Sequence, residues 1–137
     1  MAAQGKSVLV ADDNAAFVEL VRVALQSDDI EVLAARDGEE ALRLARERRP
    51  DVVVLDLLMP RVDGLSALVR LRADAATRDV PVLMVSGMPG GEAERLARAF
   101  GAGEFLVKPF PPRVLVERVR ALLALNAASP EPAPGAA

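Results

Sequence analysis

Five short apolar runs alternate with amphipathic segments along the chain, and this alternation restricts the fold more than any other feature of the sequence. The runs cover residues 7–11, 30–35, 52–55, 80–86 and 104–107. Most are continuously apolar rather than alternating, which is typical of parallel strands covered on both faces. A strand–helix order repeated five times therefore predicts an open parallel sheet with helices on both faces, joined by right-handed crossovers.

The segments between the runs carry apolar residues at helical spacing. Residues 15–26, for example, place Phe17, Leu20, Val21, Ala24 and Leu25 on one face. The second helix is expected to open at Asp37-Gly-Glu-Glu40, a capping-box pattern, and to end at Pro50. Asp37-Gly38 is also a hairpin signal, but the helical run after it favours a helix. Further helices are expected over residues 64–72, 91–100 and 112–125.

The chain has no histidine and no cysteine, and these two absences exclude several classes of chemistry. Without histidine there is no imidazole general base, no Ser-His-Asp triad and no histidine metal ligand. Without cysteine there are no disulfides, thiol nucleophiles or thiolate metal sites, which fits a reducing compartment. Any metal must therefore be bound by oxygen atoms, which favours a hard cation such as Mg²⁺.

The length of 137 residues predicts one folded domain, expected over residues 1–126. Residues 127–137 are rich in Pro and Ala and are expected to form a disordered tail, although such a tail can also begin a linker in a longer protein. A formal net charge of −3 indicates no field that would attract nucleic acid or an anionic membrane. No apolar run suits a signal peptide or a membrane span, so a cytoplasmic location is expected.

Polar or ionisable side chains stand at the ends of four of the runs. Asp12 and Asp13 follow the first, Asp56 the third and Lys108 the fifth, while Ser86 closes the fourth. Because parallel strands end at the same edge of a sheet, these side chains are expected to meet there. Two carboxylates ~4 Å apart at an effective dielectric near 20 repel by about 4 kcal/mol. Lys108 and a divalent cation would offset that repulsion.

Each of these residues also has an ordinary structural interpretation. The acidic pair precedes Asn14 and suits a helix cap, Ser86 suits a turn, and Lys108 alone suits a solvated surface. Asp56 is harder to explain in this way, because a charge that follows VVVL is costly to bury unless partners compensate it. Together the residues match phosphoryl chemistry, with a carboxylate nucleophile, a cation and a lysine for the phosphoryl charge, and a hydroxyl donor.

Along residues 6–126 the chain resembles the receiver domain of two-component response regulators, and in particular the stand-alone type that is similar to chemotaxis regulators. The stretches that carry the resemblance are VLVADDN (8–14), VVVLDLLMPRVDG (52–64), VLMVSG (82–87) and GAGEFLVKPF (101–110). The resemblance implies an α/β fold, flavodoxin-like and doubly wound (βα)5, with five parallel strands in the order 2-1-3-4-5.

The resemblance also implies a phosphoacceptor and a metal site. Asp56 would accept the phosphoryl group. Asp13 would bind Mg²⁺ directly, Asp12 would orient the metal and its water, and Asp56 and the backbone carbonyl of Leu58 would complete the protein ligands. Mn²⁺ is an alternative ion for the same oxygen ligands.

A second set of implied roles concerns the phosphoryl group and the switch. Lys108 would pair with the phosphoryl oxygens, Ser86 would turn inward to bond one of them, and Gly87 would leave space beside the group. Phe105 occupies the aromatic switch position, where tyrosine is commoner, and would rotate inward; plain core packing is its alternative role. The Lys108–Pro109 peptide bond is expected to be cis, a form that in practice requires proline.

The implied function is that of a phosphoacceptor signalling module. A sensor histidine kinase or a phosphotransfer protein would donate from a phosphohistidine, and the face formed by helix four, strand five and helix five would then change for a downstream protein. The product would hydrolyse slowly by self-catalysis, so the chain is not expected to be a turnover enzyme. A second copy of the chain is another candidate partner, whereas nucleic acid and membranes are not expected as partners.

Other interpretations bear on the same residues. A phosphohydrolase similar to haloacid dehalogenases needs an acid two residues after the nucleophile, where this chain has Leu58. A receiver-like module that binds partners without phosphorylation is compatible with every residue. A dinucleotide-binding domain is excluded, because ADDN follows the first strand in place of a glycine-rich turn. The last helix has a wide apolar stripe, which fits either core or an interface: Val114, Leu115, Val116, Val119, Leu122, Leu123 and Leu125.

Overall fold

The computed structural model describes residues 5–26, 29–59, 61–88 and 91–128, which form a five-stranded sheet and five helices. All neighbouring strands are parallel, and their order across the sheet is β2-β1-β3-β4-β5. This confirms the predicted fold class and strand order. In chain order the elements are β1 (Lys6–Ala11), α1 (Ala15–Leu25), β2 (Ile30–Ala35), α2 (Gly38–Arg48), β3 (Val52–Asp56), α3 (Gly64–Ala73), β4 (Val82–Ser86), α4 (Gly91–Ala99), β5 (Glu104–Val107) and α5 (Pro112–Ala128).

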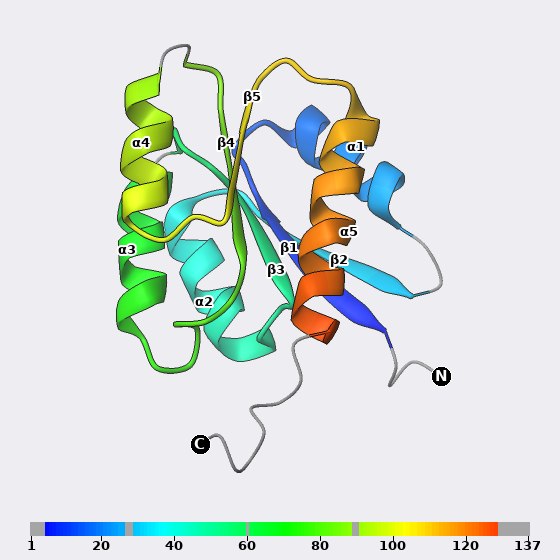
Figure 1. Ribbon diagram of the computed structural model, residues 1–137, viewed down its shortest axis with the longest axis horizontal. Coiled ribbons are helices and arrows are strands. Elements are labelled where there is room, and N and C mark those ends of the chain that lie inside the picture. The colour runs from blue at the N-terminus through cyan, green and yellow to red at the C-terminus, as the bar shows by residue number, and fades with distance from the viewer. Residues whose placement is uncertain (1–4, 27–28, 60, 89–90, 129–137) are drawn as a thin grey trace.

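Helices cover both faces of the sheet, with α1 and α5 on one side and α2, α3 and α4 on the other (Figure 1). Successive strand residues point to opposite faces, so each strand supplies two cores. In β1, for example, Leu9 belongs to the core under α2–α4, whereas Val8 and Val10 belong to the core under α1 and α5. Burial on both faces is the reason why the strands read as continuous apolar runs.

The start of β4 differs from its predicted start at residue 80. The N–H of Val80 donates to the carbonyl of Thr77 in a turn, and Pro81 has no N–H to donate to a neighbouring strand. The strand therefore begins at Val82. At the other end of the chain α5 continues to Ala128, three residues beyond the predicted helix, and residues 129–137 of the predicted tail lie outside the described part of the chain.

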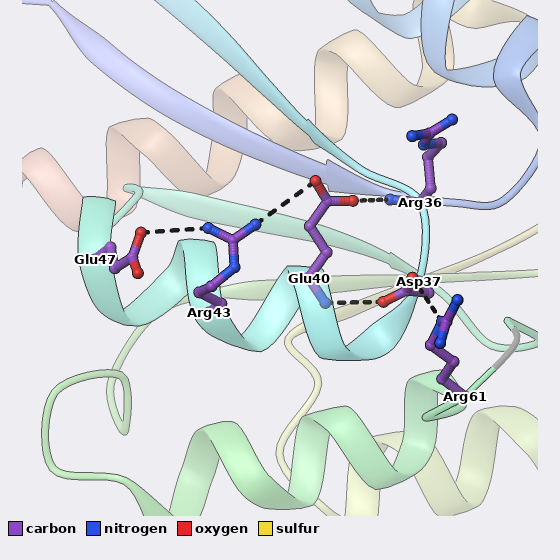
Figure 2. A network of polar contacts seen from close by, with 6 residues as sticks. All are labelled: Arg36, Asp37, Glu40, Arg43, Glu47 and Arg61. Carbon is purple, nitrogen blue, oxygen red and sulfur yellow. Dashed lines mark hydrogen bonds and ion pairs between the residues drawn. The ribbon is translucent and has the colours of Figure 1, made fainter.

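A network of polar side chains fixes the start of α2 (Figure 2). Asp37 Oδ1 accepts the N–H of Glu40 at 2.8 Å, as the predicted capping box requires, so the hairpin interpretation of Asp37-Gly38 is wrong. The carboxylate of Glu40 accepts the N–H of Arg36 at 2.9 Å, one residue before the cap, rather than the N–H of the cap itself. The first bond satisfies an N–H of the first helical turn, which has no intrahelical partner, and the second fixes the residue before the cap.

The same network reaches the loop between β3 and α3. Arg61, which has a positive φ of 69°, pairs with Asp37 through its Nε at 3.2 Å. Beside this pair the backbone of Gly38 lies so close to Val62 that an added Cβ would overlap the Val62 carbonyl oxygen. The start of α2 therefore supports the loop that follows the end of β3, where Asp56 lies.

The start of α3 packs directly under the end of β3. The N–H of Gly64 donates to the carbonyl of Leu57 at 2.8 Å. A Cβ added at Gly64 would overlap the carbonyl oxygen of Asp56 and lie 2.8 Å from the Cα of Leu57. The absence of a side chain at residue 64 thus sets how closely the loop folds back against the strand end.

Near the amino ends of β4 and β5, at the other end of these strands from the acidic residues, the guanidinium of Arg72 joins three segments. It donates to the carbonyls of Arg78 (3.0 Å), Val80 (2.7 Å) and Gly101 (2.7 Å). Burial lowers the pKa of Arg72. The three bonds connect the end of α3, the approach to β4 and the turn after α4, and they use the fork of donors that arginine alone provides. Among the described residues no helix combines the length and apolar character needed to cross a bilayer.

Candidate functional site

Three carboxylates meet at the carboxyl ends of two neighbouring strands. Asp12 and Asp13 directly follow β1, and Asp56 is the last residue of β3. One oxygen from each of the three carboxylates lies within 4.8 Å of the other two. Asp12 and Asp56 are buried, with 1% and 7% of their surfaces exposed, whereas Asp13 is exposed. The structure therefore brings together the acidic residues that the sequence placed at one edge of the sheet.

The carboxylate of Asp12 is held by both of its oxygens. Oδ1 accepts the N–H of Asn14 at 2.9 Å, and Oδ2 accepts a hydrogen bond from Lys108 Nζ at 2.9 Å. The helix cap is Asn14, whose Oδ1 accepts the N–H of Phe17 at 3.1 Å. The acidic pair is therefore not the cap of α1.

Lys108 reaches the acidic cluster from the end of β5. Its Nζ lies 2.9 Å from Asp12 Oδ2 and 3.8 Å from Asp56 Oδ1, and its side chain is 25% exposed. Its backbone N–H donates to the carbonyl of Ser86 at 2.7 Å, and its peptide bond to Pro109 is cis. Lys108 is thus not a solvated surface lysine but the cation closest to the cluster among the described residues.

Burial and neighbouring charge make the Asp56 carboxyl harder to ionise. Burial is the largest cause, the charge of Asp12 adds to it, and the ammonium of Lys108 partly opposes both, so the pKa of Asp56 rises from 3.8 to about 6. One ammonium does not compensate three carboxylates. A further cation at the cluster would relieve the remaining negative charge, and the oxygen donors fit a hard divalent ion.

We expect the stability of the metal-free protein to fall as the pH rises from about 4 to above 6, because the folded state binds the Asp56 proton more tightly than the unfolded state does. A shift from 3.8 to about 6 corresponds to a loss on the order of 3 kcal/mol. Asp56→Asn removes this effect. In a chelating buffer, denaturant unfolding should find the variant more stable than the wild type at pH 7.5, with the difference vanishing near pH 4. An equal difference at both pH values would contradict the assignment to Asp56.

The remaining predicted residues occupy the ends of β4 and β5. Ser86 is fully buried, and its Oγ accepts the N–H of Met88 at 3.0 Å, so its hydroxyl stabilises the turn after β4. A Cβ at Gly87 would meet nothing within 4 Å, which leaves open space at this turn. Phe105 is 6% exposed and packs in the core under α2–α4. In this structure Phe105 is therefore already in an inward position.

Leu58 lies in the loop after β3, and its side chain is 59% exposed. The neighbouring carbonyl, that of Leu57, accepts the N–H of Gly64 and so fixes the course of this loop. The apolar stripe of the last helix is mostly core: Leu115, Val119, Leu122 and Leu123 are buried, whereas Leu125 is 67% exposed.

Two aromatic residues near Lys108 were not predicted from the sequence to border the site. Lys108 Nζ lies 4.3 Å from the centre of the Phe17 ring, and Phe110 packs edge-on against that ring with centroids 6.0 Å apart at 82°. The helical pattern placed Phe17 on the core face of α1. Its position in the first turn after the acidic pair was the one available signal that it borders the site.

Comparisons with known proteins agree with this geometry. The family model of the response regulator receiver domain matches residues 8–120. The DNA-binding dual master transcriptional regulator RpaA of Synechocystis is 39% identical over 118 residues, which cover 85% of this chain and 48% of that protein. The phosphate regulon transcriptional regulatory protein PhoB of Pseudomonas aeruginosa is 34% identical, covering 87% and 52%. The chain thus spans about half the length of these curated relatives.

Solved receiver structures match over nearly their whole length. The receiver domain of the Francisella response regulator 1452 has a TM-score of 0.82 and 32% identity, covering 88% of this chain and 98% of that one. The chemotaxis protein CheY4 of Vibrio cholerae has a TM-score of 0.80 and 32% identity, covering 86% and 98%. The strand order, the acidic cluster at the strand ends and these matches lead to one conclusion: the chain belongs to the family of response regulator receiver domains.

Proposed function

We propose that the chain is a phosphoacceptor module that receives a phosphoryl group on Asp56 from a phosphohistidine of a sensor histidine kinase or a phosphotransfer protein. One observation supports this most directly: Asp56 is buried at a strand end, 3.8 Å from Lys108 Nζ and clustered with Asp12 and Asp13. These 137 residues contain no histidine, so the donor histidine lies outside them. In this proposal the chain is a substrate that is modified and hydrolysed slowly, not an enzyme with turnover.

In the transfer step an Asp56 carboxylate oxygen attacks the phosphorus. The new O–P bond forms as the bond between phosphorus and the imidazole nitrogen of the donor breaks, and that nitrogen keeps the electron pair. Lys108 lies within 4 Å of both Asp12 and Asp56 and would pair with the phosphoryl oxygens. Ser86 and Gly87, at the end of β4, would supply a hydroxyl donor and open space beside the group.

The proposed cofactor is Mg²⁺, with Mn²⁺ as an alternative. Asp12, Asp13, Asp56 and the backbone carbonyl of Leu58 would hold it, and the three carboxylates have the oxygen donors that such ions prefer. When bound, the ion would supply positive charge that stabilises the transferring phosphoryl group. The raised pKa of Asp56 fits a site that needs this charge to keep its carboxylate ionised.

The output would pass through the face formed by α4, β5 and α5. Phe100 at the end of α4 and Val107 at the end of β5 are 45% and 42% exposed, which leaves apolar surface for a downstream protein or a second copy of the chain. Ser86 and Phe105 would couple this face to Asp56. Because RpaA is a DNA-binding regulator, the expectation that nucleic acid is not a partner has no support, and output through DNA in a longer protein belongs to the proposal.

The test is intact-mass analysis after incubation with a small acyl phosphate. With Mg²⁺ we expect the wild type to gain the mass of one phosphoryl group, because the cation offsets the charge of the carboxylates. Addition of a chelator should abolish the gain, and Mn²⁺ should restore it. Equal uptake in the presence of the chelator would contradict the metal requirement. No uptake with any donor or ion would contradict the phosphoacceptor function and favour a module that binds partners without phosphorylation.

A further inference from the structure

Four residues at the site form a closed ring of contacts. Asp12 accepts the N–H of Asn14 at 2.9 Å, and Asn14 accepts the N–H of Phe17 at 3.1 Å. The centre of the Phe17 ring lies 4.3 Å from Lys108 Nζ, and Nζ donates a hydrogen bond of 2.9 Å to Asp12, which closes the ring of contacts. The backbone that caps α1 and the side chain of the site lysine therefore belong to one connected unit.

The position of the Phe17 ring is set from two sides. Its backbone N–H is fixed by the Asn14 cap, and the ring packs edge-on against Phe110 at 6.0 Å. Phe17, Phe110 and Lys108 also line an apolar cavity of about 220 Å³ between α1 and α5. Because the cavity leaves space beside the ring, close packing alone does not force its face toward the ammonium.

The ammonium of Lys108 has unequal partners in the cluster. It makes a hydrogen bond to Asp12, whereas 3.8 Å to Asp56 is an ion pair without a hydrogen bond. The face of an aromatic ring attracts a cation but accepts no directed bond that would hold the ammonium in one orientation. Contact with Phe17 thus restrains Lys108 near both carboxylates and still leaves it free to exchange hydrogen-bond partners.

We propose that Phe17 is a positioning residue for Lys108, whose ring face holds the ammonium between Asp12 and Asp56 before the phosphoryl group arrives. This inference rests on the proposed function for its effect on phosphorylation but not for its effect on the lysine. A restrained lysine loses less conformational freedom when it pairs with the phosphoryl oxygens. The cation–π contact corresponds to about a two- to five-fold effect on the rate of uptake.

The first readout is the NMR signal of the lysine side chains. Lys6 and Lys108 are the only lysines of the chain, so Lys6 is an internal reference. Protons above the face of an aromatic ring shift upfield, so the Lys108 Hε signals should lie upfield of those of Lys6 in the wild type. They should remain so in Phe17→Trp and move to the position of Lys6 in Phe17→Leu, which keeps an apolar side chain without the ring.

The second readout is the initial rate of uptake from a small acyl phosphate with Mg²⁺, followed by intact mass. Phe17→Leu should be about two- to five-fold slower than the wild type, and Phe17→Trp should restore the rate because indole binds cations best. Val23→Leu, a conservative change at a residue of α1 that is 68% exposed and has no part in the site, should leave both the rate and the Lys108 signals unchanged.

The outcomes separate this inference from the proposed function. Lys108 signals that coincide with those of Lys6 in the wild type would overturn the inference, and so would equal rates for the wild type and Phe17→Leu. No uptake by the wild type would contradict the proposed function instead. In that case the NMR comparison still decides whether Phe17 holds Lys108.

Discussion

Asp56→Asn is expected to eliminate phosphoryl uptake, from near-complete modification of the wild type to no detectable adduct under the same donor and metal conditions. An amide oxygen is nearly isosteric with the carboxylate oxygen but is a far weaker nucleophile toward phosphorus. The variant keeps Asp12, Asp13 and Lys108, so the loss cannot be assigned to removal of the whole cluster. Intact mass measures the adduct, and peptide mapping identifies the modified residue.

The matched control for this prediction is Asp13→Asn, which makes the same chemical change on a neighbouring carboxylate of the cluster. Asp13 is exposed, and its proposed role is to bind the metal. We expect this variant to take up the phosphoryl group slowly and to need more Mg²⁺, because a ligand is weakened while the acceptor remains. An adduct on the Asp56→Asn variant equal to that on the wild type would refute the assignment of Asp56 as acceptor.

Gly64→Ala is expected to destabilise the protein by roughly 1–3 kcal/mol, the usual cost of forcing extra atoms into a packed site. The new Cβ would overlap the carbonyl oxygen of Asp56, which is backbone and cannot move aside as a flexible side chain does. Either β3 or the start of α3 must shift, and a shift of β3 displaces the Asp56 carboxylate. Chemical denaturation should therefore show lower stability, and the surviving folded protein should take up phosphoryl groups more slowly.

Gly91→Ala is the control for Gly64→Ala, because both glycines are the first residues of helices. A Cβ at Gly91 would meet nothing within 4 Å. Its substitution should leave stability unchanged or slightly higher, since alanine loses less conformational entropy on folding than glycine does. Similar losses at both positions would show that the cost comes from the backbone preference of glycine and not from the contact with Asp56.

The sequence predicted the sheet and the acidic cluster because both follow from short-range patterns. Continuous apolar runs gave the parallel strands, and the residue after each run had to lie at the same edge of the sheet. Asp12, Asp13, Asp56 and Lys108 therefore met where expected. Lys108 and Asp12 are 96 residues apart, but their contact could be predicted from the parallel topology alone, because both follow strands that end at the same edge of the sheet.

The contacts that were missed depend on how elements pack against each other. Helical spacing correctly placed Phe17 toward the sheet, but it could not distinguish a core ring from a ring under Lys108. The close approach of Gly64 to Asp56 depends on the path of the loop between β3 and α3. The same holds for Arg61, whose pairing with Asp37 joins two segments with no periodic relation. Patterns along one element carry no information about such distances.

Fewer buried residues attach α4 to the sheet than attach α1. Ala97 is the only fully buried residue among those described in α4, whereas α1 buries Val18, Val21 and Leu25. Removing one buried methyl group from the core costs about 0.8 kcal/mol, which is comparable to the net gain of about 1 kcal/mol from a single hydrogen bond. Arg72 fastens the chain just beyond the carboxyl end of α4 through the Gly101 carbonyl. Both the buried Ala97 and the bond from Arg72 to Gly101 lie at the carboxyl end of α4, so that end of the helix is held more firmly than its amino end.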